Sequence, residues 1–434
     1  MTLTRTLGRL LSEGAARRIY ELPGPEGERM GKDGHVVVQF TDGTEANRGT
    51  SALGFEGKAV LSNQIAVQVF ALLRACGIPV SFVEARDETS YFAHRTEAIF
   101  YRAVARREAH GSYCRRHPHL APGQRLPELV VEFFLETEDA TFDGHTLPCR
   151  QPLLRLARSV QGGPGALSLW SSDQPALVSE PLLSVPLPHP LEVFQQLARL
   201  TADAFLVLQK AWQLQSVRLA DLSLGFGRTS AGEIVVSEID GDCARLVSGT
   251  EIFGNVGVRP DSKPKSIALG YQRVLEGTRR FTQPDDTLVL WRASERDDIG
   301  AFHAALKDVI GEHLSVFEVC CSAHKQTARA LGELDQIEAR YPQAVIIAFV
   351  GRSNGLGPVL AANTHLPVLC VPASAKDFPD DVWSSLRMPS DVPCSTILDP
   401  RNAVLHALGI LSKDSPYLSM KLISRKPGYF QIAW

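Results

Sequence analysis

The chain has 434 residues, 44% hydrophobic and 21% charged, a globular composition that predicts at least two domains at this length. Its 45 lysines and arginines against 48 aspartates and glutamates give a formal net charge of -3, which excludes a chain-wide basic surface for nucleic acid or an anionic membrane. The eight cysteines form no Cys-x-x-Cys pair, no apolar run approaches the roughly 20 residues of a membrane span, and no apolar signal core opens the chain, so we expect a cytoplasmic protein with reduced thiols.

The first part of the chain, up to about Asp143, predicts a mixed α+β domain. Its strand-like runs are short and rich in β-branched and aromatic residues, namely Val36–Phe40, Val80–Val83 and Leu129–Leu135. Among them, Asn63–Cys76 carries apolar residues at helical spacing that form one wide face. These segments indicate a sheet of short strands with a helix packed against it.

The middle of the chain predicts a loop, a helix and a pair of strands. Gln161–Pro188 is rich in proline, glycine and serine, which indicates a loop or a weakly ordered insertion. Pro190–Trp212 follows, with apolar residues spaced for burial on one face of a helix. Ser223–Phe226 and Glu233–Ile239 then predict two strands around a turn.

A linker divides the chain into two domains. Phe281–Asp286 interrupts the regular pattern, so we predict an N-terminal domain of residues 1–280 and a C-terminal domain of residues 285–434. Beyond the linker, short apolar strands alternate with helices. The expected strands are Leu288–Trp291, Ser315–Cys321, Ala344–Val350 and Pro367–Val371, and the expected helices include Ile299–Glu312 and Gln326–Tyr341. This alternation predicts a three-layer α/β domain in which helices cover both faces of a parallel sheet.

Ligands of such sheets bind at the carboxyl ends of the strands. The loops at these ends are Arg292–Asp298, Ser322–Lys325 and Gly351–Pro358. In the second loop, Ser322, His324 and Lys325 gather a hydroxyl, an imidazole and an ammonium group at the start of a helix, where backbone N–H groups also favour an anion. A lone histidine at a helix start is more often an ordinary neighbour of the cap, but a second polar loop at the same edge favours a site.

That other loop combines close backbone approach with hydrogen-bond donors. Its glycines, Gly355 among them, let a ligand come close to the backbone. Arg352, Ser353 and Asn354 offer donors beside them. We therefore expect these residues and His324 to form one anion-binding site.

These C-terminal motifs resemble the animal-type aminoimidazole ribotide (AIR) carboxylase domain. The matching segments are Ser322–Lys325, Gly351–Val359, Asn363–Thr364 and Asp381–Arg387. The resemblance implies that His324 transfers the proton when CO2 joins C4 of the aminoimidazole ring, with Ser322 and Lys325 beside it and without ATP or biotin. An imidazole suits this task because the ring carbon must lose its proton once the new bond has formed. The resemblance also implies a homo-oligomer built on this domain.

One loop departs from that family. Its first strand leads into a Gly-Ser-x-Ser-Asp loop that binds the ribotide phosphate, whereas here the strand leads into Arg292–Asp298, which has no glycine. Arg292 and Arg296 offer positive charge, and three carboxylates of the same loop oppose it. The identity of the ribotide therefore stays open.

The N-terminal part resembles SAICAR synthetase, the enzyme that makes succinylaminoimidazolecarboxamide ribotide, across most of Leu11–Arg279. The matching segments are Glu13–Gly14, Arg18–Glu21, Glu56–Ala59, Ser62–Asn63, Arg106–Arg107, Gly111–Ser112, Glu132–Leu135, Phe226–Gly227 and Asp240–Arg245. The resemblance implies an ATP-grasp-like fold that uses ATP and Mg2+ to activate a carboxylate and then couples the amine of aspartate to it.

By position, the resemblance places Arg106, Ser112, Asp242 and Arg245 around the ribotide and its carboxylate. An arginine supplies a two-pronged donor for phosphate or carboxylate, which fits that use. The alternative is that Arg106 and Arg107 belong to a solvated charged face.

The nucleotide side differs from the family. Gly14–Arg17 stands where the family has Gly-Lys-x-Lys, so Gly14, Arg17 and Lys58 are the implied nucleotide-binding residues. Ser223–Gly227 stands where the family has Lys-x-Glu-Phe-Gly, which removes a lysine and a metal-side carboxylate. We expect ATP binding here to be weak, altered or absent.

The family's metal-binding aspartate aligns with Ser237, so Glu238 is the implied metal ligand. Adjacent residues of a strand face opposite ways, and Glu238 can replace the aspartate only if the strand bulges or slips.

Three functions remain open on the sequence. The first is a bifunctional purine enzyme that makes SAICAR from AIR in two steps. The second is a diverged relative that acts on a related aminoimidazole nucleotide in a nucleoside-antibiotic pathway of the coformycin or pentostatin kind. The third is a non-catalytic paralogue that serves as a scaffold.

Overall fold

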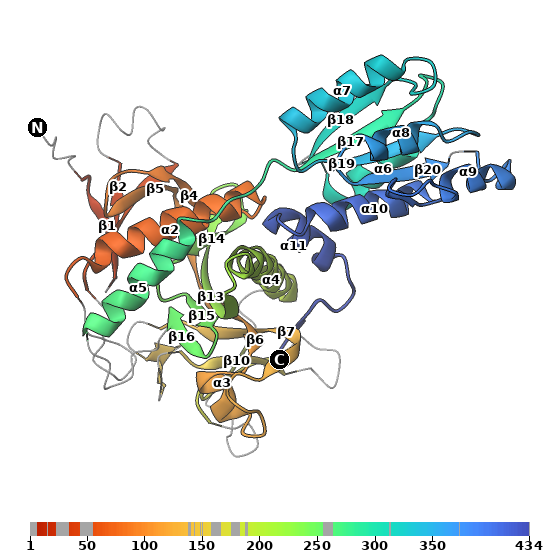
Figure 1. Cartoon of the computed structure of the whole chain (residues 1–434). Coiled ribbons are helices and arrows are strands. Elements are labelled where there is room, and N and C mark those ends of the chain that lie inside the picture. The colour runs from red at the N-terminus through yellow and green to blue at the C-terminus, as the bar shows by residue number, and fades with distance from the viewer. Residues whose placement is uncertain are drawn as a thin grey trace, which may run out of the picture. The chain divides into compact units, whose positions relative to one another are not determined.

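The computed structural model of the chain contains two compact units (Figure 1). It describes residues 7–14, 16–22, 34–43, 55–137, 140–142, 144–147, 149, 151–157, 166–174, 183–186, 190–254, 264–311, 314–372 and 374–433. The first unit comprises Met1–Thr282 and Pro427–Trp434, and the second comprises Gln283–Lys426. Within the described ranges no helix is long and apolar enough to cross a membrane, and none of the eight cysteines forms a disulfide.

The boundary between the units falls inside the expected linker. Residues 281–286 have no regular structure and separate helix α5 (Pro264–Thr278) from strand β17 (Thr287–Arg292). The expected C-terminal domain comprised all of residues 285–434, but Pro427–Trp434 belongs to the first unit. Strand β22 (Phe430–Ile432) pairs in parallel with β7 (Arg125–Leu135) of the first unit, so the last residues return to it.

A five-stranded sheet and helix α2 (Lys58–Ala75) form one part of the first unit. Its strands follow the order β1 (Leu10–Glu13), β2 (Arg17–Glu21), β3 (His35–Phe40), β5 (Ser90–His94) and β4 (Phe82–Ala85). Helix α2 packs against β3, β4 and β5, and the rings of Phe70, Phe82 and Tyr91 meet in the core between them. The expected helix at Asn63–Cys76 is confirmed, but it begins earlier, directly after Gly57 in a left-handed conformation.

A ten-stranded sheet forms the other part of the first unit. Its main path is β12 (Leu183–Pro186), β11 (Ala166–Trp170), β10 (Leu153–Ala157), β7, β6 (Thr96–Glu108), β13 (Arg218–Thr229), β15 (Ala244–Ser248) and β16 (Glu251–Gly254), with β14 (Ile234–Glu238) on β13 and β22 on β7. Helix α4 (Leu191–Gln213) packs against β6, β7 and β13, while α5 packs against α2 and β16. The short helix α3 (Gly111–Arg116) follows β6, and β8 (Thr141–Phe142) pairs with β9 (His145–Thr146).

The expectation that Gln161–Pro188 is a loop is wrong in part. Strands β11 and β12 both lie within this stretch, and they extend the sheet by antiparallel pairing beyond β10. Backbone hydrogen bonds to a neighbouring strand hold them, and such pairing leaves little trace in a composition rich in proline, glycine and serine.

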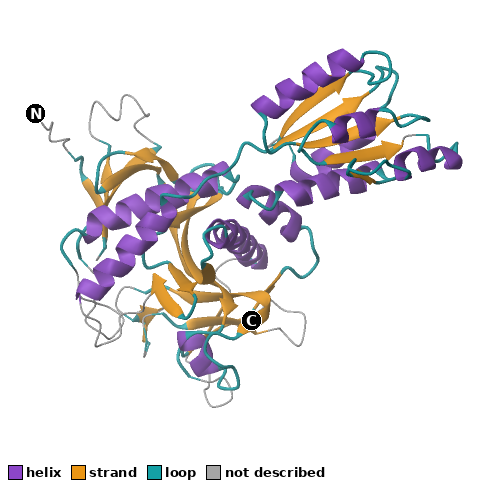
Figure 2. Ribbon diagram, in the orientation of Figure 1, coloured by secondary structure: helices purple, strands orange, loops and turns teal. Residues whose placement is uncertain are grey.

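The second unit has the expected parallel sheet with helices on both faces (Figure 2). The strand order is β18 (Ser315–Cys320), β17, β19 (Val345–Val350), β20 (Val368–Pro372) and β21 (Cys394–Thr396). The helices are α6 (Gly300–Ile310), α7 (Thr327–Arg340), α8 (Leu356–Ala362), α9 (Trp383–Leu386), α10 (Pro400–Leu411) and α11 (Pro416–Ser424), with a 3-10 turn η1 (Pro379–Val382) before α9. Because β17 lies between β18 and β19, the loops that follow these three strands share one edge of the sheet.

Candidate functional site

At the carboxyl edge of the parallel sheet, His324 lies against the backbone of Gly355. A Cβ atom added to Gly355 would lie 1.7 Å from the Nε2 atom of His324, closer than any non-bonded contact allows. The imidazole itself is exposed, as is the neighbouring Lys325, while Ser322 is half-buried and its Oγ accepts the Lys325 N–H at 3.4 Å. The two loops that sequence reasoning placed together therefore touch at their histidine and their glycine.

Asn354 holds the glycine-rich loop in place. Its buried side chain accepts the Gly357 N–H at 2.8 Å and donates to the Ser385 Oγ at 3.0 Å, and its own N–H donates to the Ser384 Oγ at 3.1 Å. These bonds commit its amide to the protein interior. The substrate contact predicted for Asn354 stays a prediction.

The tip of that loop presents positive charge. The Arg352 side chain is 66% exposed, and its Nε donates to Asp381 Oδ2 at 2.9 Å. Its guanidinium also lies 3.9 Å from the centroid of the Phe378 ring. Ser353 is exposed beside it. Both side chains are accessible to a ligand, although Asp381 offsets part of the charge.

The loop after β17 is bonded to itself. Arg292 Nη1 donates to the carbonyl oxygens of Glu295 and Asp297, each at 3.3 Å. The Ser294 N–H donates to Asp297 Oδ2 at 2.9 Å, so a carboxylate of the loop takes a donor that a phosphate would otherwise use. Arg292 thus supports the fold of the loop.

In the first unit, a row of charged residues crosses three strands of the larger sheet. Arg106 on β6 pairs in register with Asp221 on β13, which pairs in register with Arg245 on β15. Asp221 Oδ2 lies 3.6 Å from Arg106 Nη1 and 2.9 Å from Arg245 Nε. One buried carboxylate therefore serves two guanidinium groups.

Glu132 on β7 completes this cluster. It is 2% exposed and accepts a hydrogen bond from Arg106 Nε at 2.6 Å and another from Arg116 Nη2 on α3. Burial alone would raise the pKa of Glu132, but the charges of Arg106 and Arg116 lower this pKa below its ordinary value. Three arginines against two carboxylates leave one positive charge, so the cluster retains attraction for an anion. Arg106 is not part of a solvated face.

The cluster lies beside the start of α3. A Cβ atom on Gly111, whose φ is +53°, would lie 3.5 Å from Arg245 Nη2, and Ser112 follows directly. The structure thus brings Arg106, Arg245 and the segment with Ser112 together, while their contact with a ribotide stays a prediction.

Asp242 belongs to a different group. Its Oδ2 accepts a hydrogen bond from the Tyr271 hydroxyl at 2.5 Å and lies 3.5 Å from Lys58 Nζ. The tyrosine ring packs on Gly241, where a Cβ atom would meet it at 2.4 Å. Lys58 and Asp242, which were predicted for the nucleotide and the ribotide, therefore neutralise each other.

A second row of residues crosses β6, β13 and β14 nearby. Arg102 pairs in register with Gly225, and Gly225 pairs with Glu238. The pairing shifts beside this point, because the next residue of β13 pairs with Val236 and leaves Ser237 as an extra residue. The bulge that Glu238 needs to face the site is present.

Both oxygens of Glu238 are held by arginines. Arg102 Nη2 lies 3.0 Å from Oε2, and Arg17 Nη2 lies 2.8 Å from Oε1. Arg102 also donates to Glu136 Oε1 at 2.7 Å. Burial alone would raise the pKa of Glu238, but these two guanidinium groups lower it. Gly14 lies between β1 and β2, and its N–H donates a hydrogen bond to the Arg17 carbonyl oxygen at 2.8 Å.

These residues do not fit a divalent cation. Mg2+ binds carboxylate and carbonyl oxygens at about 2.0 to 2.1 Å, and both oxygens of Glu238 are already paired with positive charge. A carboxylate at residue 225 is excluded by space, since a Cβ atom there would lie 2.7 Å from Glu238 Oε2. Throughout the described part of the chain, no group of three or more His, Cys, Asp and Glu side chains is placed to hold a metal ion.

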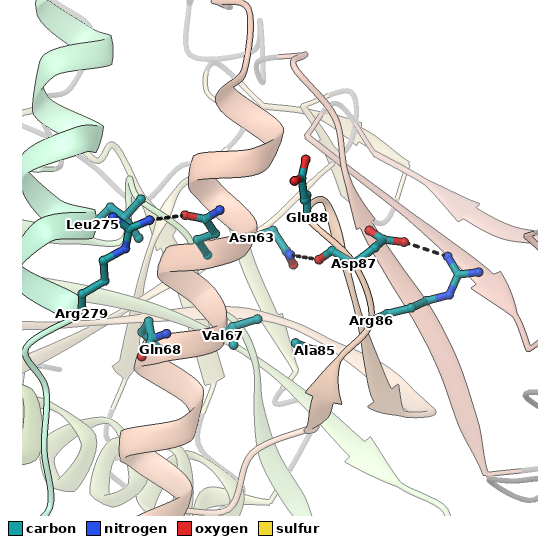
Figure 3. Close-up of a pocket in the computed structure, with 10 residues that line it drawn as sticks. Asn63, Val67, Gln68, Ala85, Arg86, Asp87, Glu88, Leu275 and Arg279 are labelled. Carbon is teal, nitrogen blue, oxygen red and sulfur yellow. Dashed lines mark hydrogen bonds and ion pairs between the residues drawn. The ribbon is translucent and has the colours of Figure 1, made fainter. Parts of the chain in front are cut away.

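A separate cleft lies between α2, the β4–β5 turn and α5 (Figure 3). Arg279 donates to Gln64 at 2.9 Å on one side of α2, and Asn63 donates to the Asp87 carbonyl at 2.9 Å on the other. The predicted site residues lie elsewhere.

Known proteins resemble both units. The AIR carboxylase family profile matches residues 294–428, and the SAICAR synthetase profile matches residues 10–148. The bifunctional phosphoribosylaminoimidazole carboxylase/phosphoribosylaminoimidazole succinocarboxamide synthetases of Rattus norvegicus and Homo sapiens are 29% and 28% identical, cover 97% and 96% of this chain, and are covered over 94% and 93% of their own lengths. A solved SAICAR synthetase in complex with ADP is 18% identical, with a TM-score of 0.47 over 64% of this chain and 100% of its own.

The chain belongs to the family of fused AIR carboxylase and SAICAR synthetase enzymes. The expected family membership is thus confirmed, along with a SAICAR-synthetase-like first part and a parallel sheet in the second.

Sequence reasoning missed several charged partners in this family member, namely Arg102, Arg116, Glu136 and Asp221. Strand pairing brings Arg102 and Asp221 to their partners, whereas Arg116 reaches Glu132 from α3 and Glu136 directly follows β7. A usable signal was present in β6, where Arg102 and Arg106 are separated by an even number of residues and so face the same side of the strand.

The first prediction concerns Glu132. Glu132→Gln leaves Arg106 and Arg116 buried without a full counter-charge, so we expect the free energy of unfolding to fall by about 3 to 5 kcal/mol at pH 7. Because the folded-state pKa of Glu132 is lowered, its stabilising effect is present above the ordinary value of 4.5 and is lost as the pH falls below it. Urea unfolding at several pH values measures both effects.

Glu13→Gln is the matched control, because Glu13 forms an exposed pair with Arg18 at 2.7 Å. It should change stability by less than about 0.5 kcal/mol. Equal stabilities of the two variants at pH 7, or a gap between Glu132→Gln and the wild type that widens below pH 4.5, would contradict the role given to Glu132.

Proposed function

We propose that the chain is a bifunctional purine-ribotide enzyme. Its C-terminal half interconverts AIR and CO2 with the carboxylated ribotide CAIR, and its N-terminal half couples aspartate to that carboxylate as a SAICAR-synthetase-type C–N ligase with an altered ATP and Mg2+ site. The observation that carries this proposal is the contact of His324 with Gly355 at the carboxyl edge of the parallel sheet, inside the segment that the AIR carboxylase profile matches.

The carboxylase step needs a base near C4 of the imidazole ring. The ring carbon attacks CO2, a C–C bond forms, and the proton on C4 must then leave. His324 is accessible to a ligand and fixed in position against Gly355, which suits it to take that proton and return it in the reverse direction. Ser322, Lys325 and the exposed Arg352 and Ser353 supply donors for the carboxylate and the ribotide.

The ribotide side of the ligase half has the charge it needs. Arg106, Arg116 and Arg245 carry one positive charge more than their two carboxylate partners, beside the segment that contains Ser112. A phosphate or carboxylate of CAIR fits this excess by bidentate hydrogen bonds from Arg245.

The proposed nucleotide side keeps fewer of the residue types that the family has there. We propose an ATP-grasp-like arrangement in which Gly14, Arg17 and Lys58 face the nucleotide, with Arg17 as the main source of charge. Lys58 forms an ion pair with Asp242, and Glu238 forms ion pairs with Arg17 and Arg102.

A second candidate function follows from the altered loops. The self-bonded loop after β17 and the arginine pair around Glu238 favour a relative that acts on a related aminoimidazole nucleotide in nucleoside-antibiotic biosynthesis. Turnover measured with AIR and CAIR separates this candidate from the first, and absence of turnover with every aminoimidazole nucleotide leaves the scaffolding role.

The second prediction tests the carboxylase half. The wild type should convert CAIR to AIR and CO2, and His324→Asn should lower the rate by a factor of about 100 to 10,000, because the carbon loses its proton acceptor. Chromatographic separation of CAIR and AIR measures the rate. Thermal unfolding should stay unchanged, since the imidazole is exposed.

Gly355→Ala provides an independent variant. Its new methyl group would displace the His324 ring, so we expect a loss of about a hundredfold in kcat from misplacement alone. Gly409→Ala is the matched control, because nothing lies within 4 Å of a Cβ atom added at that position. Wild-type activity in His324→Asn would remove the proposed base, and an inactive wild type would remove AIR and CAIR as substrates.

The third prediction concerns assembly. We propose a homo-oligomer built on the second unit, supported by large apolar side chains that stand exposed around η1 and α9, namely Phe378, Trp383 and Leu386. Sedimentation equilibrium should give a multiple of 47.4 kDa. A monomer at all concentrations would contradict this proposal.

A further inference from the structure

The side chains around Glu238 form an ion-pair network that joins strands β2, β6 and β14. Glu238 receives Arg17 from β2 and Arg102 from β6, and Arg102 continues to Glu136 and to the Ser223 Oγ at 3.2 Å. The side chains of Arg17 and Arg102 are 16% and 11% exposed, while Glu238 is 33% exposed. The carboxylate is thus reachable from solvent. Both of its oxygens are paired, and the same two arginines also face the carboxylates of Glu136 and Asp240.

The network depends on the absence of a side chain at Gly225. This residue lies between Arg102 and Glu238 in the cross-strand row, and the two charged side chains meet across it. A Cβ atom there would lie 2.7 Å from Oε2 and 2.9 Å from Cδ of Glu238. The bulge at Ser237 and the glycine at residue 225 together let Glu238 reach Arg102.

A divalent cation beside a bound phosphate neutralises charge and orients oxygen atoms. Two guanidinium groups carry the same total charge of about +2, and a guanidinium group is a planar donor that suits phosphate or carboxylate oxygens. All three nitrogens of Arg102 already donate within the protein, so Arg17 is the donor of the pair that would contact a ligand. Arg17 and Arg102 hold this charge on both sides of the carboxylate that the family resemblance assigns to the metal.

We propose that Arg17 and Arg102 take the place of the divalent cation, so that the N-terminal site binds the phosphate groups of its ligand without Mg2+. This inference rests on the proposed nucleotide site of the ligase half. It assigns Arg17 as the positioning residue for phosphate, Arg102 as the second positive charge, and Glu238 as the anion that holds both in place. A metal ion at Glu238 would displace both guanidinium groups from the carboxylate and leave them largely buried without this counter-charge, which is unfavourable.

The test measures metal binding directly. Wild-type protein is titrated with Mn2+ and the free ion is followed by electron paramagnetic resonance. We expect no Mn2+ site that depends on Glu238, so the wild type and Glu238→Gln should leave the same amount of free ion. One Mn2+ per chain that is lost in Glu238→Gln would overturn the proposal.

Variants of the arginines give the positive arm. Arg17→Met combined with Arg102→Met frees the Glu238 carboxylate next to Asp240, and we expect this protein to gain one Mn2+ per chain. Arg17→Met alone serves if the double variant does not fold, as judged by circular dichroism. Arg18→Met is the matched control, because Arg18 lies on the same strand and its ion pair is with the exposed Glu13. No gain of Mn2+ in a folded Arg17→Met variant would show that the arginines do not occupy the cation's place.

Calorimetry with ADP separates this inference from the proposed function. If ADP binds, we expect its affinity to differ by less than twofold between buffers with EDTA and with Mg2+, and to fall at least tenfold in Arg17→Met. Binding that is tenfold or more tighter with Mg2+ would overturn the inference while leaving the nucleotide site. If ADP does not bind under either condition, the nucleotide part of the proposed function fails, and the Mn2+ titrations alone decide the inference.

Discussion

The first unit depends on charged side chains that meet on one face of a β-sheet. Two rows cross neighbouring strands, one through Asp221 and one through Gly225, and each places arginines within ion-pair distance of buried or half-buried carboxylates. Buried charges are stable only when they are paired, because the energy of removing them from water is large. The rows therefore restrict what each strand position can hold and what ligand charge the site accepts.

The two rows differ in their remaining charge, and this difference separates the proposed ribotide side from the proposed nucleotide side. The row through Asp221 keeps an excess positive charge next to α3, which favours an anionic ribotide. The row through Gly225 balances Glu238 with two arginines and excludes a second carboxylate by space. Under the proposed function, this arrangement would keep ribotide recognition in the ligase half while its nucleotide chemistry departs from metal-assisted activation.

Sequence reasoning described the second unit better than the first, for physical reasons. In the parallel sheet each strand is a short apolar run followed by its own helix, so local pattern and fold agree, and the expected strand Ala344–Val350 is β19 with one residue fewer. In the first unit, charged residues such as Arg102 lie inside buried strands, and β11 and β12 lie in a stretch whose composition suggests a loop. Some of the ion pairs there join residues more than a hundred positions apart, as with Arg102 and Glu238, which strand register brings together.

The central claim is that this chain binds a carboxylated aminoimidazole ribotide in both halves and needs no divalent cation to do so. Calorimetric titration of the whole chain with CAIR, in EDTA and again in Mg2+, tests it most directly, with Arg245→Met to identify the N-terminal site. The account predicts two sites per chain in either buffer and the loss of one in Arg245→Met. No binding of CAIR, or an N-terminal site that forms only with Mg2+, would contradict it.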